Sequence, residues 1–321
     1  MRRLLASLAV LGTVALASAA SAGEPWQDAI ATGLGKPGTA MPGGVYRVGL
    51  PRTDLNVTLD GVQLKPSFAL GSWLAFVRHG SGDEVMVMGD LVLTDDEVNP
   101  VMKRLVEGGL EITALHNHLL RNTPHTMYMH VGGHGDAGKL ATTLREALGA
   151  SKTPFGGATA GATPPKVGGA EPASAGEGPV PAKATAPDQA LDLDTAAIDA
   201  VLGRKGKVNG GVYAVSVPRA ETPKDHGMEV PEAMGSAIAI NFQPTGGGKA
   251  AITGDFVLTA DEVNPVIKAL RASGIEVTAL HNHMLEDEPR LFFMHFWAND
   301  DAAKLAKGLR DALDQVKVAK G

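Results

Sequence analysis

The chain has 321 residues, 44% of them hydrophobic and 20% charged, and a formal net charge of −6. This composition is typical of a globular protein, and the length allows two ordinary domains with a core each. An acidic chain without a basic stripe is a poor partner for nucleic acid, because it cannot neutralise phosphates. The absence of cysteine excludes disulfides, a thiol nucleophile and a lipidated cysteine.

Residues 1–22 have the pattern of a secretory signal peptide. Arg2 and Arg3 precede an apolar run from Leu4 to Ala17, and Ala20-Ser21-Ala22 is a small-residue cleavage site. A run of this length is too short to span a hydrocarbon core of ~30 Å. We therefore expect cleavage after Ala22 and a periplasmic or secreted protein that is neither a lipoprotein nor inserted in a membrane.

The rest of the chain consists of two similar halves. Between Gly89–Leu120 and Gly254–Leu285, 22 of 32 aligned positions are identical. Residues 150–190 are mostly Ala, Gly, Pro, Ser and Thr, with too little apolar surface to offset the entropy of ordering. Because each copy exceeds the length of a solenoid repeat, the pattern indicates domain duplication. We predict domains at 23–149 and 191–321, joined by a disordered linker at 150–190.

Each copy contains alternating or apolar strand patterns and two helix patterns. In the first copy, strands are expected at 45–50, 68–77, 84–93, 111–119 and 126–131. Thr94 and Glu97 form a capping-box signature before a helix that ends at Gly108-Gly109, and a second helix is expected at 136–148. The order β-β-β-α-β-β-α predicts an α+β fold in two tandem copies, each an antiparallel-rich sheet with helices on one face.

Three histidines recur at equivalent positions of the two copies, whereas the other histidines do not. They are His116, His118 and His130 in the first copy and His281, His283 and His295 in the second. Strict alternation places Ile112, Ala114, His116 and His118 on one strand face, and a hairpin turning near Thr123 places His130 opposite His116. Two imidazoles at i and i+2 with a third from the next strand are typical of a three-histidine metal site, commonly for zinc.

Other polar positions are candidates for supporting roles. Asp90 and Asp255, in the shared Gly-Asp dipeptide, are candidates for a fourth ligand or for orienting an imidazole; the alternative is an aspartate bonding its own turn. Arg52 and Arg219 have the residue type to clamp an anion, although simple exposure at a strand end is the plainer interpretation. Met129 and its neighbours are expected in the core, away from the histidines. No nucleotide-binding motif is present, so no nucleotide cofactor is expected.

The strings GDLVLTDDEVNPV, ITALHNHLL and MYMH, with their second-copy counterparts, resemble the bacterial LppY/LpqO-like family, a domain of unknown function named for two lipoproteins. The resemblance covers nearly all of the chain outside the signal peptide and linker and implies no established activity. Because the chain has no cysteine, it implies no lipid anchor either. The positions that match are Asp90, His116, Asn117, His118, His130, Asp255, His281, Asn282, His283 and His295.

The leading hypothesis is an exported protein that binds a metal ion or small ligand through one histidine triad per domain, with Zn²⁺ or another divalent transition metal as the cation. Two alternatives stay open: a metal-dependent envelope enzyme of hydrolase or lyase type, and a non-catalytic envelope interaction module with structural histidines. The apolar histidine-bearing faces also predict that the two halves pack together about a pseudo-twofold axis.

Overall fold

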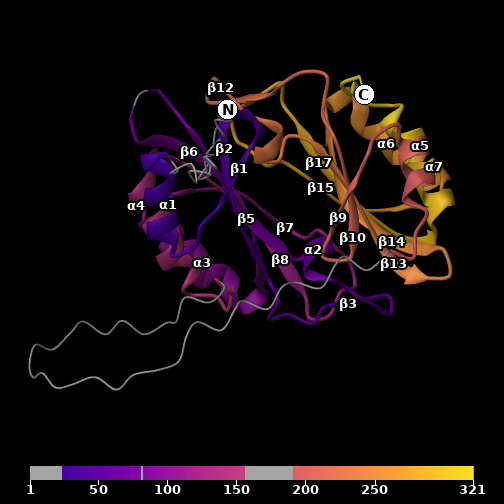
Figure 1. The fold of residues 1–321 in the computed structure, drawn as a ribbon, viewed down its shortest axis with the longest axis horizontal. Helices are drawn as coiled ribbons and strands as arrows, with labels where there is room; N and C mark the ends of the chain where they lie inside the picture. Colours follow the sequence, from indigo (N-terminus) through magenta and orange to yellow (C-terminus); the bar gives the residue numbers. More distant parts are fainter. Residues whose placement is uncertain (1–23, 81, 156–190, 321) are drawn as a thin grey trace, which may run out of the picture.

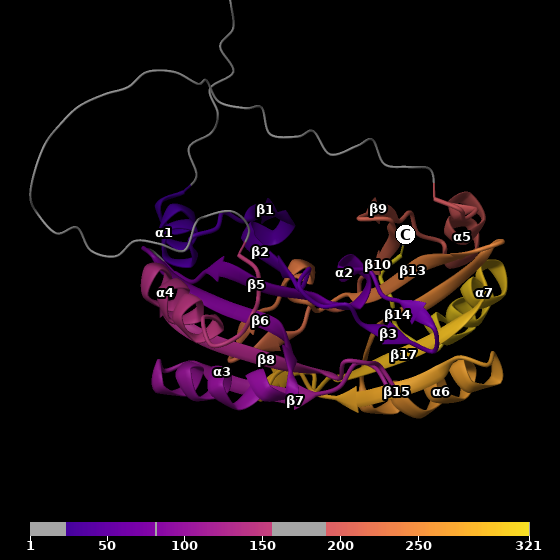
Figure 2. The same cartoon turned by 90° about the horizontal axis from the view of Figure 1, so that it is seen from below.

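The computed structural model describes residues 24–80, 82–155 and 191–320. Each half is a six-stranded antiparallel sheet with helices on one face, as the sequence predicts for two tandem α+β copies. The sheets face each other across the middle of the molecule, and the helices lie on the two outer sides (Figures 1 and 2). The expected signal peptide and residues 156–190 of the expected linker lie outside the described residues.

The strand order of the first half is β1-β2-β5-β6-β8-β7. Its elements are α1 Pro25–Leu34, β1 Thr39–Met41, η1 Pro42–Gly44, β2 Val45–Pro51, β3 Thr58–Leu59, β4 Val62–Gln63, α2 Pro66–Ala69, β5 Gly71–Arg78, β6 Glu84–Thr94, α3 Asp95–Glu107, β7 Glu111–His116, β8 Thr126–Asp136 and α4 Ala137–Leu148.

The second half repeats this order as β9-β10-β13-β14-β17-β15. Its elements are α5 Thr195–Leu202, β9 Lys207–Asn209, β10 Val212–Val217, β11 Lys224–Asp225, β12 Met228–Glu229, η2 Glu232–Met234, β13 Ile238–Gly246, β14 Lys249–Leu258, α6 Ala260–Ala272, β15 Glu276–His281, β16 Asp287–Glu288, β17 Phe292–Asp301 and α7 Ala302–Leu313. No helix in the described part of the chain has both the length and the apolar character that a membrane crossing requires.

Each sheet buries one face under its helices and the other against the opposite half. In the first half, Met129 packs with residues of α1, α3 and α4, away from the histidines as expected. Ala75, Met86 and Met88 lie in one apolar cluster with core residues of the second half. A second cluster joins Phe68 and Tyr128 to Trp297. Burial of apolar surface stabilises by about 25 cal/mol per Å², so both shared clusters contribute to holding the halves together.

The predicted capping boxes of α3 and α6 are present, and α3 continues through Pro100. Sequence patterns did not reveal α1 and α5, which pack on α4 and α7 respectively. Trp26, Ile30 and Leu34 of α1 are buried at a helical spacing, so this helix closes the outer face of the first half.

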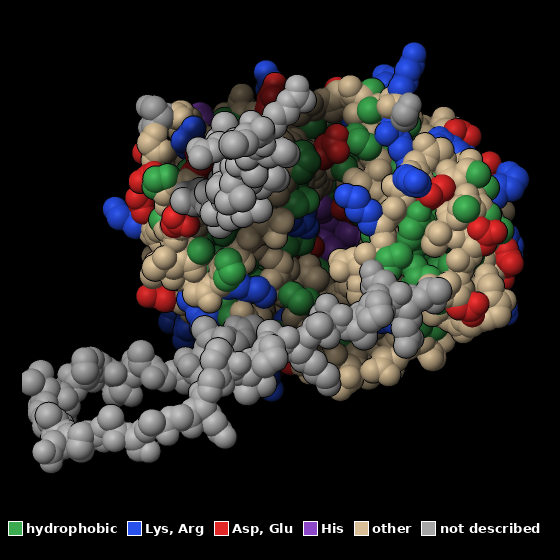
Figure 3. Space-filling view, viewed as in Figure 1, with side chains coloured by type: hydrophobic (Ala, Val, Ile, Leu, Met, Phe, Trp, Pro, Cys, Tyr) green, Lys and Arg blue, Asp and Glu red, His purple; other side chains and the backbone are tan. Residues whose placement is uncertain are grey.

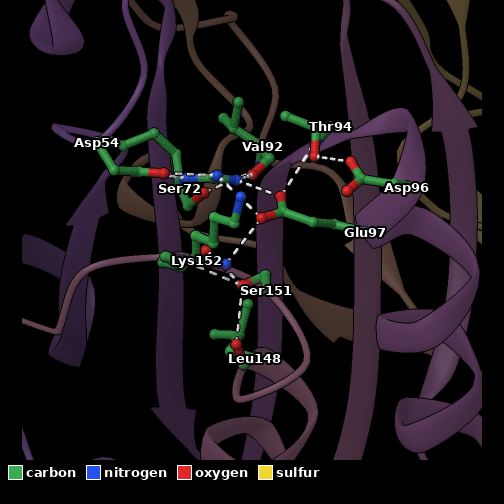
Figure 4. Close-up of polar contacts among 11 residues, drawn as sticks. Asp54, Ser72, Val92, Thr94, Asp96, Glu97, Leu148, Ser151 and Lys152 are labelled. Atoms are coloured by element: carbon green, nitrogen blue, oxygen red, sulfur yellow. Dashed lines mark hydrogen bonds and ion pairs between the residues drawn. The ribbon is translucent and has the colours of Figure 1, made fainter.

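Arg52 is fully buried, so the expectation of an exposed arginine at this strand end was wrong. Its guanidinium donates to Glu97 Oε2 at 2.7 Å and to the Val92 carbonyl at 2.7 Å. Figure 4 shows Glu97 between Thr94 at the helix start and Lys152, whose backbone N–H donates to Glu97 Oε1. Arg219 and Glu262 repeat the pair in the second half, so this ion pair is part of the scaffold.

Candidate metal centre

Strand register decides where the histidines lie. His130 on β8 pairs with Asp90 on β6 on one side and with Ala114 on β7 on the other. His116 pairs with Tyr128, so the expectation that His116 lies opposite His130 was wrong by one pleat. The continuous pairs from Ala114 to His116 centre the hairpin on Asn122 rather than Thr123, which moves the partner of His116 by two residues. A bulge between Ile112 and Ala114, which the sequence pattern did not reveal, shifts only the pairs that precede it.

Two further details of the predicted strand differ in the structure. Ile112 pairs with Val131 and packs with the helix-side core, not with the histidine face. Strand β7 ends at His116, and His118 lies in the turn that follows. In the second half β15 ends at His281 and carries the equivalent bulge, so the His-x-His segments leave both sheets in the same way.

The two triads meet between the halves and form one cluster. His116 stacks on His281 with ring centroids 3.4 Å apart. His118 stacks on His295 at 3.6 Å and His130 on His283 at 3.7 Å, so each contact joins one half to the other. The last two contacts exchange equivalent residues, which is the pattern of a pseudo-twofold axis passing between His116 and His281. We call these six residues the histidine cluster.

Four overlapping sets drawn from this cluster and two neighbouring aspartates have ligand atoms no more than 4.8 Å apart. Two combine histidines of both halves, and two combine histidines of one half with its aspartate. The sets are His116, His118, His281 and His295; His116, His130, His281 and His283; Asp255, His281, His283 and His295; and Asp90, His118 and His130. Imidazole and carboxylate ligands in sets of three or four are what zinc binds in proteins.

Backbone carbonyls orient several of the rings. His295 Nδ1 donates to the Gly254 carbonyl at 2.7 Å, and His281 Nδ1 donates to the Asn282 carbonyl at 3.0 Å. His130 bonds the Gly89 backbone in the equivalent way. A neutral imidazole that donates from Nδ1 has its lone pair on Nε2, the arrangement found around metal-bound histidines.

The Nε2 atoms of all six clustered histidines are buried and have no hydrogen-bond partner. Asp90 Oδ1 and Asp255 Oδ1 are also without a partner. A buried polar atom left unpaired costs about 1–3 kcal/mol, so native proteins rarely tolerate many together. The cluster therefore presents lone pairs that call for a cation or a ligand donor.

Charge is suppressed throughout the cluster. Burial lowers the pKa of His281 to about 4, and burial followed by neighbouring imidazoles holds the pKa of His118 well below its usual range. Burial raises the pKa of Asp90 to about 8 against the opposing effect of Arg47. Burial and then Asp90 raise the pKa of Asp255 well above its usual value. At neutral pH the imidazoles are neutral, which is the form that binds metal.

The Gly-Asp dipeptide has a structural reason at each position. A Cβ on Gly254 would lie 1.9 Å from the Ala239 carbonyl oxygen of the neighbouring strand, so only glycine fits. Its partner Asp255 points to the cluster, with Oδ2 3.4 Å from His283 Nε2. Asp90 Oδ2 lies 3.8 Å from His118 Nε2. Both aspartates sit within strands and face imidazoles, which disfavours the alternative of a turn-bonding aspartate.

The asparagine of each His-Asn-His segment joins the halves. Asn117 Nδ2 donates to the Thr278 carbonyl at 3.1 Å, and Asn282 Nδ2 donates to the Thr113 carbonyl at 2.9 Å. The sequence marked both positions only through the family resemblance. Each His-Asn-His segment thus places two histidines in the cluster and one amide against a strand of the other sheet.

A cleft of about 670 Å³ between the halves opens onto the cluster. Asp90, His118, Asp255, His283 and His295 line it, and Figure 3 shows histidines at the bottom of this hollow beside a Lys or Arg side chain. Tyr128 stacks on His118 and Phe293 stacks on His283, each with ring centroids 3.4 Å apart. Solvent and small molecules thus have a path to the imidazoles.

Comparison with solved structures gives only remote similarity. EtuB from Clostridium kluyveri is 9% identical over 87% of this chain and 89% of its own, with a TM-score of 0.20. The trimeric bacterial microcompartment shell protein PduB is 12% identical over 88% of this chain and 95% of its own, with a TM-score of 0.19. Scores this low support no argument about fold or function, and no curated protein matches the chain.

The family comparison is decisive for identity. Residues 28–150 and 196–315 each match one family, described as Domain of Unknown Function (DUF1259). The two matches cover both halves and most of the chain. The protein therefore belongs to the DUF1259 family and contains two tandem copies of its domain.

Proposed function

We propose that the histidine cluster binds divalent transition metal, with zinc as the default ion, at a centre to which both halves contribute. The observation that carries the proposal is the convergence of six buried, unpaired Nε2 atoms, three from each half. A purely structural cluster would leave these atoms unsatisfied in a site of low charge, whereas a metal ion bound by one of the four sets satisfies three or four ligand atoms at once.

The experiment is elemental analysis of the purified full-length mature protein. His118→Gln/His281→Gln removes a ligand from each of the four sets, so its zinc content should fall from at least one equivalent to background. His125→Gln/His226→Gln alters two histidines outside the sets and is the matched control. Circular dichroism verifies the fold of both variants. Equal metal in wild type and the His118/His281 variant would refute the proposal.

A second function is favoured by the cleft, because a metal that a small molecule can reach can polarise or hydrolyse it. This is the metal-dependent envelope enzyme of hydrolase or lyase type. The same preparation loaded with cobalt(II) separates the two: a visible spectrum that changes on adding azide supports an open coordination position. An unchanged spectrum supports a closed, non-catalytic centre. A module with purely structural histidines would bind neither ion.

We also propose that the protein is exported, on the basis of the signal-peptide pattern at residues 1–22, and that it acts in the periplasm or outside the cell. The match of both copies to the strings of the LppY/LpqO-like family supports placing the chain near those proteins, without their lipid anchor. The chain has no cysteine, so no thiolate competes with the histidines for the ion at the proposed envelope site.

A further inference from the structure

The two walls of the cleft differ in chemistry. On the first half, Arg47, Trp73 and Tyr128 line it. Strand pairing places Ala214, Ala239 and Phe293 at the equivalent positions of the second half. The histidine cluster is therefore shared evenly, while one wall alone carries a guanidinium, an indole and a phenol.

Arg47 is held in place from two sides. Its guanidinium carbon lies 4.1 Å from the centroid of the Trp73 ring. One nitrogen, Nη1, donates to the Ala233 carbonyl of the opposite half at 2.8 Å. Arg47 forms no ion pair with a carboxylate of the described residues, in contrast to the fully paired Arg52. A guanidinium has five N–H donors, so most of them remain for a ligand in the cleft.

The surroundings select the charge of that ligand. Arg47 is the one Lys or Arg among the described residues that line the cleft, whereas Asp90, Asp255 and Glu232 supply acidic groups. A dianionic phosphate would meet this single cation, so its second negative charge would have no cationic partner among the lining residues. A carboxylate carries a single charge and matches the planar fork of a guanidinium with two parallel hydrogen bonds.

The body of the ligand is selected by the same wall. Trp73, Tyr128, Phe68 and Pro66 line the cleft on the side of Arg47. Its volume of about 670 Å³ falls in the range of pockets for small molecules. Tyr128 and Phe68 are buried, so the apolar surface open to the body of a ligand is that of the partly exposed Trp73 and Pro66.

We propose that the cleft binds a small organic monocarboxylate with an apolar or aromatic body, that Arg47 binds its carboxylate, and that the rest of the molecule extends toward the histidine cluster. In this assignment, only the contact between the ligand and the histidine cluster rests on the proposed metal centre. Recognition of the acid by Arg47 stands independently of the ion.

The test is isothermal titration of the full-length mature protein with 3-phenylpropionate, 3-phenylpropionamide and phenyl phosphate. The acid should bind at least about tenfold more tightly than the amide, because a hydrogen-bonded charge pair is lost with the amide. Arg47→Met should reduce binding of the acid to the level of the amide. Arg78→Met, which alters an exposed arginine paired with Glu24, is the matched control and should bind as wild type does.

Zinc content measured on the same samples separates this inference from the metal proposal. Arg47→Met with unchanged zinc and lost acid binding supports recognition by Arg47. Binding of the acid that depends on Arg47 in a protein without zinc supports the inference while refuting the metal centre. Equal binding of acid and amide by wild type, equal acid binding by wild type and Arg47→Met, or tighter binding of phenyl phosphate would each overturn it.

Discussion

The two halves keep the same centre and differ at its walls. His116 and His281, Asp90 and Asp255, and the buried Arg52–Glu97 and Arg219–Glu262 pairs occupy equivalent places. Where the first half has Arg47 and Trp73 at the cleft, the second half has Ala214 and Ala239 at the equivalent positions.

This difference separates two requirements. The histidines and aspartates near the pseudo-twofold axis form ligand sets to which both halves contribute. A substitution in one half therefore also changes the site for the histidines of the other half. Groups farther out along the cleft, such as Arg47, are present in one half only. The histidine cluster therefore requires the same residues in both copies, whereas recognition of a ligand by the cleft wall requires them in one copy only.

The largest expected effect tests the equivalence of the two scaffolds. Arg52→Met and Arg219→Met each leave a buried glutamate unpaired and should reduce the free energy of unfolding by about 3–5 kcal/mol. Urea denaturation of the full chain measures the loss. Arg78→Met, at an exposed pair with Glu24, is the control and should change stability by less than about 1 kcal/mol. A loss confined to one half would show that the pairs are not equivalent.

The second prediction sharpens a difference between the Gly-Asp dipeptides. A Cβ on Gly254 would meet the Ala239 carbonyl oxygen at 1.9 Å, whereas on Gly89 it would meet the movable Leu74 Cδ2 at 2.6 Å and the Trp73 carbonyl oxygen at 2.9 Å. Overpacking costs about 1–3 kcal/mol and more where backbone must shift. Gly254→Ala should therefore lower the urea midpoint more than Gly89→Ala. A larger loss for Gly89→Ala would contradict the closer contact of the Gly254 position with the backbone.

The smallest effect is a pH dependence common to both halves. Burial opposes, but hydrogen bonds from Arg52, Lys152 and Thr94 outweigh it and lower the pKa of Glu97 below 4.5. An acid with a lowered pKa in the folded state stabilises above its unfolded value, and this contribution is lost as pH falls below 4.5.

The slope reaches at most about 1.4 kcal/mol per pH unit for each glutamate. Measuring unfolding between pH 5 and pH 3 for wild type and Glu97→Gln checks this, and the variant should show a shallower slope. Glu262→Gln repeats the measurement in the second half, where Arg219 lowers the pKa of Glu262 in the same way. Equal slopes in wild type and both variants would contradict the assignment.

Much of the fold follows from local sequence signals. Period-two patterns and the Thr94–Glu97 capping box identified the strands and helices of the sheet, and the repeat indicated two copies. Helices α1 and α5 were not predicted, because each is short and its apolar residues are buried only through packing on α4 or α7. The bulge at Thr113 also escaped, because it is a property of strand pairing rather than of composition.

For the site, recurrence of residues in both copies was the useful signal. It singled out the six histidines and two aspartates that the structure brings within a few ångströms. It could not show that the two sets would interleave, because that depends on how whole sheets dock. The role of Arg47 was not predicted, because comparison of the copies identifies shared residues and this arginine is present in the first copy only.

The fusion of both copies in one chain has a consequence for any molecule in the cleft. Two identical subunits would present the same guanidinium at either rim, and an unsymmetrical guest would bind in two opposite poses. A single arginine on one wall removes that degeneracy, because only one orientation satisfies it. The duplicated chain thus has a cleft whose two walls differ, while the histidine cluster at its bottom stays symmetric.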